Sequence, residues 1–262
     1  MAVQTPIDPV NELQAAFRVL LNNWILAIPT ALVSLIAAIF AVFMIAGFMA
    51  SVMGAGLTGM HPGMAGALLG AGGLTLFVGV IILVLLSLLA HATVIGAAEH
   101  VWRGQAADLP GGFAKAMAKL GPLFVLFIIL CLIGLVCAIL TPLLGLGLIV
   151  GLVLAFFFMY SLPAIVVGNR SATEALGDSW RLVRANTGPS IIAFIGIIVV
   201  SIVGQIIITL FHAIPFLHVI VSFIVGGLTA AFVALVLVRF YDLLSGTGRA
   251  MVAPPSPTMP RV

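Results

Sequence analysis

Histidine and methionine side chains gather in one Gly-rich stretch of the chain. Half of the ten methionines lie in this stretch, and two of them, Met60 and Met64, flank His61. His212 and His218 add two imidazoles further along the sequence. Thioether sulfur and imidazole nitrogen are ligands that suit Cu(I), so a soft-metal site is one hypothesis. Methionine also fills irregular gaps between apolar helices, and this packing role is the interpretation we favour.

Two polar side chains stand inside long apolar runs, His91 in the second run and Gln205 in the fifth. An ionisable residue at membrane depth indicates function by default. His91, however, lies only about two turns from Glu99, so a hydrogen bond to a neighbouring helix is favoured over proton handling. Gln205 is predicted to join two helices through its amide. We predict neither buried carboxylates nor a broken helix at mid-membrane, which argues against ion-coupled transport.

The patterns of enzyme catalysis are missing from the sequence. No serine or cysteine has a histidine and an acid in a credible arrangement, and no Gly-Lys-Ser/Thr follows the glycines as a phosphate loop requires. Cys131 and Cys137 share one apolar run, where six helical residues rise about 9 Å, beyond the reach of a disulfide. The sequence therefore predicts no enzyme and no cofactor, and a membrane-embedded hydrolase is the least favoured alternative.

The elements that must position these residues are six apolar runs. Hydrophobic residues make up 63% of the 262-residue chain and charged residues only 6%, whereas a soluble domain carries roughly a quarter charged residues. Each run is about as long as the 20 residues that a membrane span needs. The runs cover residues 24–50, 74–98, 122–140, 146–167, 190–211 and 219–241. They predict an all-α polytopic bundle of six transmembrane helices arranged as three hairpins.

Charge distribution orients this bundle. Charged residues precede the first run and follow the second, fourth and sixth, while the alternate connections carry none, including the long Gly-rich loop expected at Ser51–Gly73. The positive-inside rule places the charged face in the cytoplasm. We therefore expect a bacterial inner-membrane protein with both termini in the cytoplasm. The basic residues are few and lie near the ends of the apolar runs, so nucleic acid is excluded as a partner. We predict a cytoplasmic N-terminal segment at 1–23, a membrane domain at 24–244 and a disordered tail at 245–262.

Each hairpin is expected to follow a short amphipathic helix that lies flat at the cytoplasmic interface. The clearest segment is 172–187, where Ser171 and Glu174 have the spacing of a capping box. The residues of this helix that we expect at the interface are Glu174, Leu176, Asp178, Trp180, Arg181, Val183 and Arg184. The segments at 17–24, 113–122 and 180–189 each open with an aromatic residue, which predicts a threefold internal repeat.

The sequence around this helix resembles a known family. Pro163–Val167 (PAIVV) and Ser171–Val183 (SATEALGDSWRLV) resemble the membrane domain associated with glycerophosphoryl diester phosphodiesterases and related bacterial six-span proteins. The resemblance implies a six-span layout from about Asn11 to Leu244. Gly168 departs from the pattern, because an acidic residue is expected there. The catalytic barrel that some members carry is absent, so phosphodiester hydrolysis is not implied for this chain.

These observations favour a non-enzymatic membrane protein that organises lipids or scaffolds partners of the cell envelope. Membrane lipids are the expected contacts, and a membrane or cytoplasmic protein is a further partner consistent with the short helices. The alternative is a small transporter or channel for lipidic or amphipathic solutes, which would need a water-accessible cavity lined by His91 and Gln205. The sequence leaves the oligomeric state open.

Overall fold

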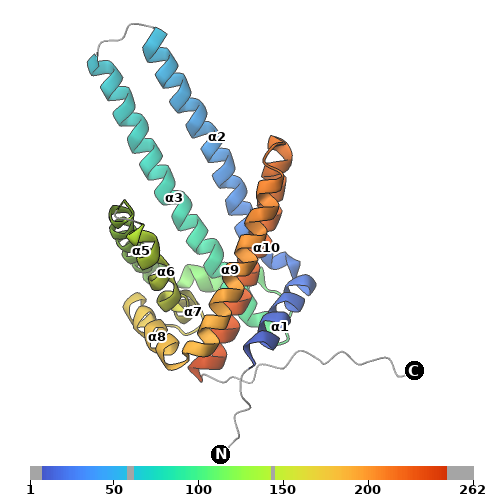
Figure 1. The fold of residues 1–262 in the computed structure, drawn as a ribbon. Helices are drawn as coiled ribbons and strands as arrows, with labels where there is room; N and C mark the ends of the chain where they lie inside the picture. The colour runs from blue at the N-terminus through green and yellow to red at the C-terminus, as the bar shows by residue number, and fades with distance from the viewer. Residues whose placement is uncertain (1–7, 58–61, 143–144, 247–262) are drawn as a thin grey trace, which may run out of the picture.

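The computed structural model describes residues 8–57, 62–142 and 145–246, and these residues form helices without any strand (Figure 1). The helices are α1 (Pro9–Asn22), the 3-10 helix η1 (Trp24–Ala27), α2 (Ile28–Leu57), α3 (Pro62–Trp102), α4 (Leu109–Ala118), α5 (Leu120–Leu140), α6 (Leu146–Phe158), α7 (Ser161–Val166), α8 (Ala172–Ala185), α9 (Thr187–Leu210) and α10 (Pro215–Ser245). The predicted disordered tail lies outside the described residues from 247 onward.

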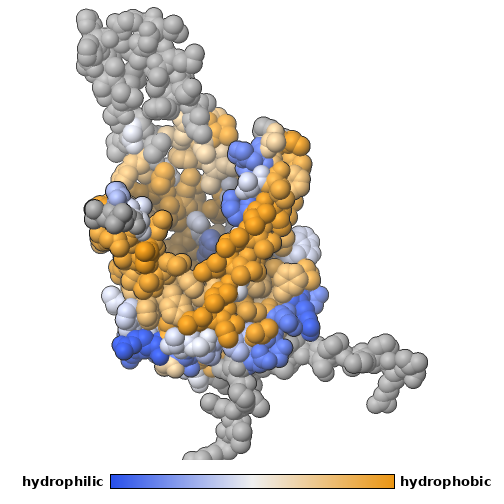
Figure 2. Space-filling model, viewed as in Figure 1, coloured by the Kyte–Doolittle hydropathy of each residue, from blue (hydrophilic) through white to orange (hydrophobic). Residues whose placement is uncertain are grey.

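Six stretches are long and apolar enough to cross a membrane: Trp24–Met44, Phe77–Trp102, Leu120–Leu140, Leu146–Val166, Thr187–Leu210 and Leu217–Ser245. Exposed large apolar side chains cover their outer surfaces, as a lipid-facing bundle requires. The prediction of an all-α, six-span fold is confirmed, and the protein is a multi-pass membrane protein. Hydrophobic residues cover the hairpins in Figure 2, and hydrophilic residues gather mainly at the end where α1 and α8 lie, called the charged end below.

The α2–α3 hairpin projects far beyond the other two (Figure 1). The sequence predicted a long outer loop at Ser51–Gly73, but α2 continues to Leu57 and α3 begins at Pro62. The loop prediction was therefore wrong over most of its length. Proline at the first helical position suits a helix start, because its missing N–H would have no partner there. The many Ala, Leu and Met residues between the glycines also favour continued helix.

The fourth apolar run is a broken helix, contrary to the sequence prediction. The α6 helix ends at Phe158 and α7 starts at Ser161. Pro163 explains the break, because its ring clashes with the carbonyl four residues earlier, at Met159, and it offers no N–H to that carbonyl. The Ser179 hydroxyl of α8 fills the break, accepting from the Tyr160 N–H at 3.1 Å and donating to the Phe157 carbonyl at 2.8 Å.

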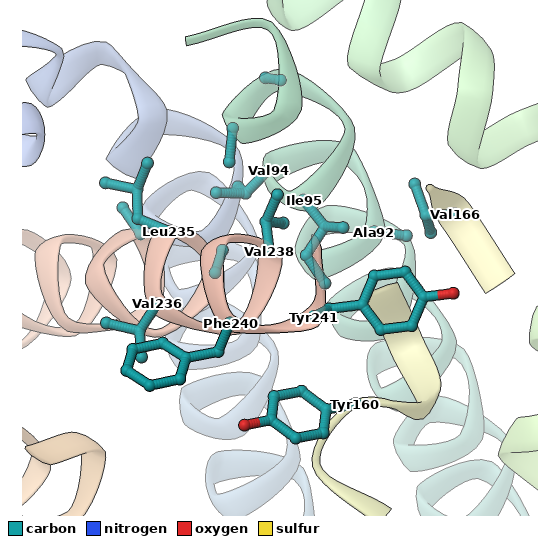
Figure 3. Packing of buried hydrophobic residues seen from close by; sticks show 14 of the residues in the cluster. Ala92, Val94, Ile95, Tyr160, Val166, Leu235, Val236, Val238, Phe240 and Tyr241 are labelled. Atoms are coloured by element: carbon teal, nitrogen blue, oxygen red, sulfur yellow. The ribbon is translucent and has the colours of Figure 1, made fainter. Parts of the chain in front are cut away.

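The packed core lies at the charged end, where α3, α7 and α10 meet (Figure 3). Tyr160 and Phe240 are fully buried beside one another, and Ile95 of α3 packs near Val238 of α10. The α4 helix packs directly on α3, because Gly96 and Gly112 face each other at the crossing. A Cβ atom on Gly96 would lie 2.9 Å from the Gly112 Cα, so this contact admits no side chain.

Beyond the core, the α5–α6 hairpin separates from the α9–α10 hairpin. The two hairpins meet near the charged end, where the Phe156 and Phe194 rings lie 5.3 Å apart. Few other contacts join them among the described residues. Figure 2 shows a hollow between them that opens on the apolar flank of the molecule.

Candidate functional site

The short helices form a cyclic arrangement at the charged end. The α4 helix packs on α3, α8 packs on α6 and α7, and α1 packs on α10 and α9. Each short helix therefore contacts the end of the preceding hairpin, and α1 closes the cycle against the last one. All three short helices therefore pack against the ends of the hairpins at the charged end of the molecule.

The three short helices are alike at equivalent positions, which supports the predicted repeat. The residues at the three N-terminal caps are Asp8, Asp108 and Ser171. Eight positions later comes a fully buried small residue: Ala16, Ala116 and Ser179. The next position holds a large apolar side chain that is 51%, 41% and 37% exposed in turn: Phe17, Met117 and Trp180. The equivalent of Phe17 in the second unit is thus Met117, and the sequence alignment on Phe113 was one helical turn out of register.

The ends of α1 and α8 are alike in detail. Asn23 and Asn186 follow them with φ of −131° in both cases and ψ of 45° and 47°. Each amide side chain donates back to the carbonyl four residues earlier, to Val19 at 3.0 Å and to Leu182 at 3.1 Å. The next helix begins after each asparagine in a new direction, so this shared cap turns the chain from the short helix toward the membrane span.

A buried carboxylate joins the first and second units. Glu99 of α3 is only 2% exposed and lies between Arg103 and Lys115. The Lys115 Nζ, contributed by α4, is 2.6 Å from the Glu99 Oε2. Burial of a carboxylate is costly unless cations and hydrogen bonds compensate its charge, and both cations here do so. This cluster holds α4 on α3 and leaves Glu99 without free oxygen atoms for a ligand.

A second charge cluster joins the first and third units. The Arg239 side chain of α10 is 8% exposed, and its Nε lies 2.7 Å from the Glu12 Oε2 of α1. Its guanidinium also lies 4.9 Å from the centre of the Trp102 ring, a cation–π distance. The Trp102 indole N–H donates to the Leu235 carbonyl at 3.0 Å. These contacts tie α1, α3 and α10 together at one point.

The residues predicted on α8 divide between its buried and exposed faces. Val183 is fully buried, and the Trp180 ring stacks on Phe157 with centroids 4.1 Å apart although the residue stays partly exposed. Leu176 is half-buried, and Arg184 is exposed. The helix packs mainly through small residues, Ala172, Ala175 and Ser179, which allow its backbone close to α7. The sequence prediction placed the larger side chains of α8 at the membrane interface and did not single out these small residues.

The predicted capping box at the start of α8 is present. The Glu174 carboxylate accepts from the Ser171 N–H at 3.0 Å and from the Ser171 hydroxyl at 2.8 Å. These hydrogen bonds lower the pKa of the Glu174 carboxyl below its ordinary value. The negative charge also suits the positive end of the helix dipole. Glu174 therefore stabilises the start of the helix, which is a structural role.

Asp178 is an ion-pair centre on the exposed side of α8. Its Oδ2 lies 3.0 Å from the Arg170 Nε, and its Oδ1 pairs with Arg181, as the spacing of Asp178 and Arg181 predicts. These three residues and Tyr241 line a cavity of about 310 Å³ between α8 and α10. The single Asp178 carboxylate is shared by both guanidinium groups, so the three side chains together carry a net charge of +1.

The intramembrane polar residues do not meet. His91 is half-buried on α3, and its Nδ1 lies 2.7 Å from the Ser87 carbonyl of the same helix. Gln205 of α9 is exposed, and its side chain has no hydrogen bond to any residue that the structure describes. The expected interhelical bond of Gln205 is therefore not seen. Neither residue lines a described cavity with the other, as a polar transport path would require.

Of the candidate metal ligands, the structure describes only His212 and His218 close together. His212 and His218 lie at the turn between α9 and α10, with ring centroids 4.9 Å apart. No group of three or more His, Cys, Asp or Glu side chains suited to a metal occurs in the described part of the chain. His61 and Met60 lie outside the described residues, as does the side chain of Met64. The two histidines alone make an incomplete ligand set for Cu(I) or Zn²⁺.

An apolar groove that is open to a ligand lies between α3 and α5 and is called the α3–α5 groove below. It has a volume of about 550 Å³ and is lined by apolar residues between Ile82 and Leu89 and between Leu120 and Phe124. Lys119 directly precedes the lining residues of α5, and its ammonium group donates to the Asn169 side chain. The groove thus starts beside a cation at the charged end and continues along two membrane-spanning helices.

Sequence reasoning missed several residues that shape this end of the molecule. One of them is Ser179, which the sequence presents only as part of a family motif. Pro163 in the fourth run is a signal for a helix break, and the backbone groups at such a break need a polar partner. Gly168 was noted as a departure from the family pattern. A Cβ atom there would lie 2.7 Å from the Ala164 carbonyl and closer still to the Tyr241 hydroxyl. The phenol of Tyr241 therefore occupies the space where an acidic side chain was expected.

The fold and this site define a multi-pass membrane protein built from three units, each a short helix followed by a hairpin. Residues 106–244, more than half of the chain, match a domain of unknown function (DUF7847), and the chain belongs to this family. The matched region covers the helices from α4 to α9 and almost all of α10. Searches of curated proteins and of solved structures return no match.

Proposed function

We propose that this protein is a non-enzymatic, lipid-associated membrane protein that holds phospholipids of the leaflet at its charged end. The α3–α5 groove carries the proposal, because it is apolar over its described lining and lies within two membrane-spanning helices. Its volume of about 550 Å³ falls in the range of small-molecule sites, which bury most of a ligand. A lipid acyl chain is the ligand that a groove of this composition would meet in a bilayer.

The charge at the start of the groove supports a phospholipid in particular. Lys119 is half-exposed beside Leu120, at the level where a headgroup phosphate would lie if the acyl chain followed the groove. A lysine near the membrane surface attracts anionic headgroups by about 1 kcal/mol. The Lys119 ammonium group donates to the Asn169 side chain, and Lys119 is adjacent in sequence to the groove residue Leu120.

The same proposal places the charged end in the cytoplasm of a bacterium, with both termini inside, since basic residues are retained on that side. The resemblance to the membrane domain of glycerophosphoryl diester phosphodiesterases fits a lipid-associated role without catalysis. A cysteine at Ala213, exposed in the turn between α9 and α10, should react with an impermeant maleimide in intact cells. A cysteine at the exposed Gln105 should not, and the reverse pattern would overturn the orientation.

A matched pair of glycines in α5 allows a direct test of the groove. Gly121 lines the groove, and a Cβ atom there would meet no other atom within 4 Å. Gly121→Leu should fill the groove without a clash and reduce the phospholipid that the full chain retains in native mass spectrometry after mild extraction. Gly134→Leu is the control, because Gly134 is equally open but lies outside the groove. Equal lipid retention by both variants and the parent protein would contradict the proposal.

A second candidate is a transporter or channel for lipidic solutes. The hollow between the α5–α6 and α9–α10 hairpins favours it, because lateral access from the bilayer is what a lipidic solute would need (Figure 2). Against it, the described groove is apolar and the break between α6 and α7 is filled by Ser179. Vesicles reconstituted with the protein should show no faster transfer of a fluorescent phospholipid between leaflets than empty vesicles. Faster transfer would favour the transporter.

A further inference from the structure

We propose that Arg18 and an apolar pocket between α1, α9 and α10 form a second lipid site, one that selects an anionic phospholipid. The pocket has a volume of about 380 Å³, and the residues that line it are Leu13, Gln14, Phe17, Arg18, Val200 and Phe232. This inference rests on the proposed lipid association and adds a headgroup preference at a different place in the fold.

The pocket belongs to a firmly anchored part of α1. The Leu13 side chain packs against Gly196 of α9, where a Cβ atom would lie 2.7 Å from the Leu13 Cδ1. The Glu12 carboxylate is held by Arg239 at 2.7 Å on the neighbouring face. Because α1 is fixed on both α9 and α10, Phe17 and Arg18 are positioned beside the span residues Val200 and Phe232.

Arg18 has no acidic partner among the residues that the structure describes. The two acids of its helix region are both engaged elsewhere. The Asp8 carboxylate caps α1, accepting from the Val10 N–H at 3.1 Å and from the Asn11 amide at 2.7 Å. The Glu12 carboxylate pairs with Arg239. The charge of this exposed guanidinium, beside membrane-spanning helices, is therefore not compensated by a carboxylate of the described protein.

The third unit of the same chain shows what Arg18 lacks. Arg181 follows Trp180 on α8 just as Arg18 follows Phe17 on α1, and Arg181 pairs with Asp178. Three positions before Arg18, the equivalent residue is Ala15, which carries no charge. The protein thus supplies Arg181 with a carboxylate, which Arg181 shares with Arg170, and supplies none to Arg18.

The chemistry of the pocket identifies the ligand. A guanidinium group binds phosphate oxygens through two parallel hydrogen bonds. The Gln14 amide adds a donor on the same helix, while Phe17, Val200 and Phe232 offer only apolar surface. A free phosphate ion would gain nothing from that surface, whereas an anionic phospholipid satisfies both parts. The charge of Arg18, unopposed by a carboxylate, favours an anionic headgroup over a zwitterionic one.

The test compares the two arginines in the full chain. Native mass spectrometry of detergent-purified protein titrated with phosphatidylglycerol or phosphatidylcholine should show a preference for phosphatidylglycerol in the parent protein. Arg18→Gln should reduce that preference by about tenfold, as the loss of one charge-assisted hydrogen-bond pair implies. Arg18→Lys should retain part of it. Arg181→Gln should reduce it much less, because Arg181 already pairs with Asp178.

The outcomes separate this inference from the proposed function. An unchanged preference in Arg18→Gln, or an equal loss in Arg181→Gln, would overturn the site at Arg18. Competition by millimolar inorganic phosphate as strong as that by phosphatidylglycerol would overturn the phospholipid as its ligand. Failure of the α3–α5 groove would instead appear as lipid retention by Gly121→Leu equal to that of the parent protein, whatever the headgroup.

Discussion

The Ser179 hydroxyl connects three helices through two hydrogen bonds. It accepts from the Tyr160 N–H and donates to the Phe157 carbonyl, the groups released where α6 gives way to α7. Both Ser179 and Tyr160 are fully buried, so water does not replace these bonds. A backbone N–H without a partner in such a place costs free energy, and the serine removes that cost.

Replacing Ser179 by alanine should therefore destabilise the protein by about 1–3 kcal/mol, the usual penalty for an unsatisfied buried donor. The measurement is the midpoint of thermal unfolding of the purified protein in detergent. Ser201→Ala is the matched control, because the Ser201 hydroxyl only adds a hydrogen bond to the Ile197 carbonyl of its own helix, at 2.7 Å. Equal midpoints for the two variants would show that Ser179 does not support the break.

Among the helices, α3 and α4 cross in close backbone contact at Gly96 and Gly112. A Cβ atom on Gly112 would lie 2.8 Å from the Ala97 nitrogen, and the Glu99–Lys115 ion pair lies nearby on the same two helices. The short helix is thus held by both backbone packing and charge. Displacing α4 would also move the start of α5, where Leu120 and Gly121 line the α3–α5 groove.

Gly112→Ala should loosen α4, with a lower unfolding midpoint and less retained phospholipid. Overpacking of a tight contact costs about 1–3 kcal/mol. Gly177→Ala in α8 is the control, because a Cβ atom there meets no atom within 4 Å, and alanine should raise helix stability slightly. If Gly112→Ala unfolded no earlier than Gly177→Ala, the close packing of α4 on α3 would be disproved.

The elements differ in how far the sequence predicts them. Long apolar runs without central charges are a strong signal, so the six spans were predicted with ends a few residues off. The capping box of Ser171 and Glu174 was predicted from residue spacing alone, because it is a local interaction. The buried face of α8 was not, since small residues such as Ala175 carry no hydropathy signal for tight packing. The break at Met159 depends on Pro163 and on Ser179, which is distant in sequence.

At the scale of the whole molecule, three related units converge at the charged end and diverge in the apolar region. The repeat is visible in the caps, the buried small residues and the exposed apolar side chains of α1, α4 and α8. The sequence indicated this repeat, but its cyclic packing could not be predicted, because α1 contacts α10 across almost the whole chain. The separation of the α5–α6 and α9–α10 hairpins creates the hollow on the apolar flank of the molecule.

The most direct test of lipid association is to map where lipid contacts the protein. The full chain would be reconstituted with a phospholipid that carries a photoreactive group on its acyl chain, and the adducts would be located by peptide mass spectrometry. We expect adducts concentrated on Leu85–Leu89 and Leu120–Phe124, well above those on Leu132 and Leu135, which are exposed on α5 outside the groove. Adducts spread evenly over all exposed apolar residues would contradict a specific lipid site.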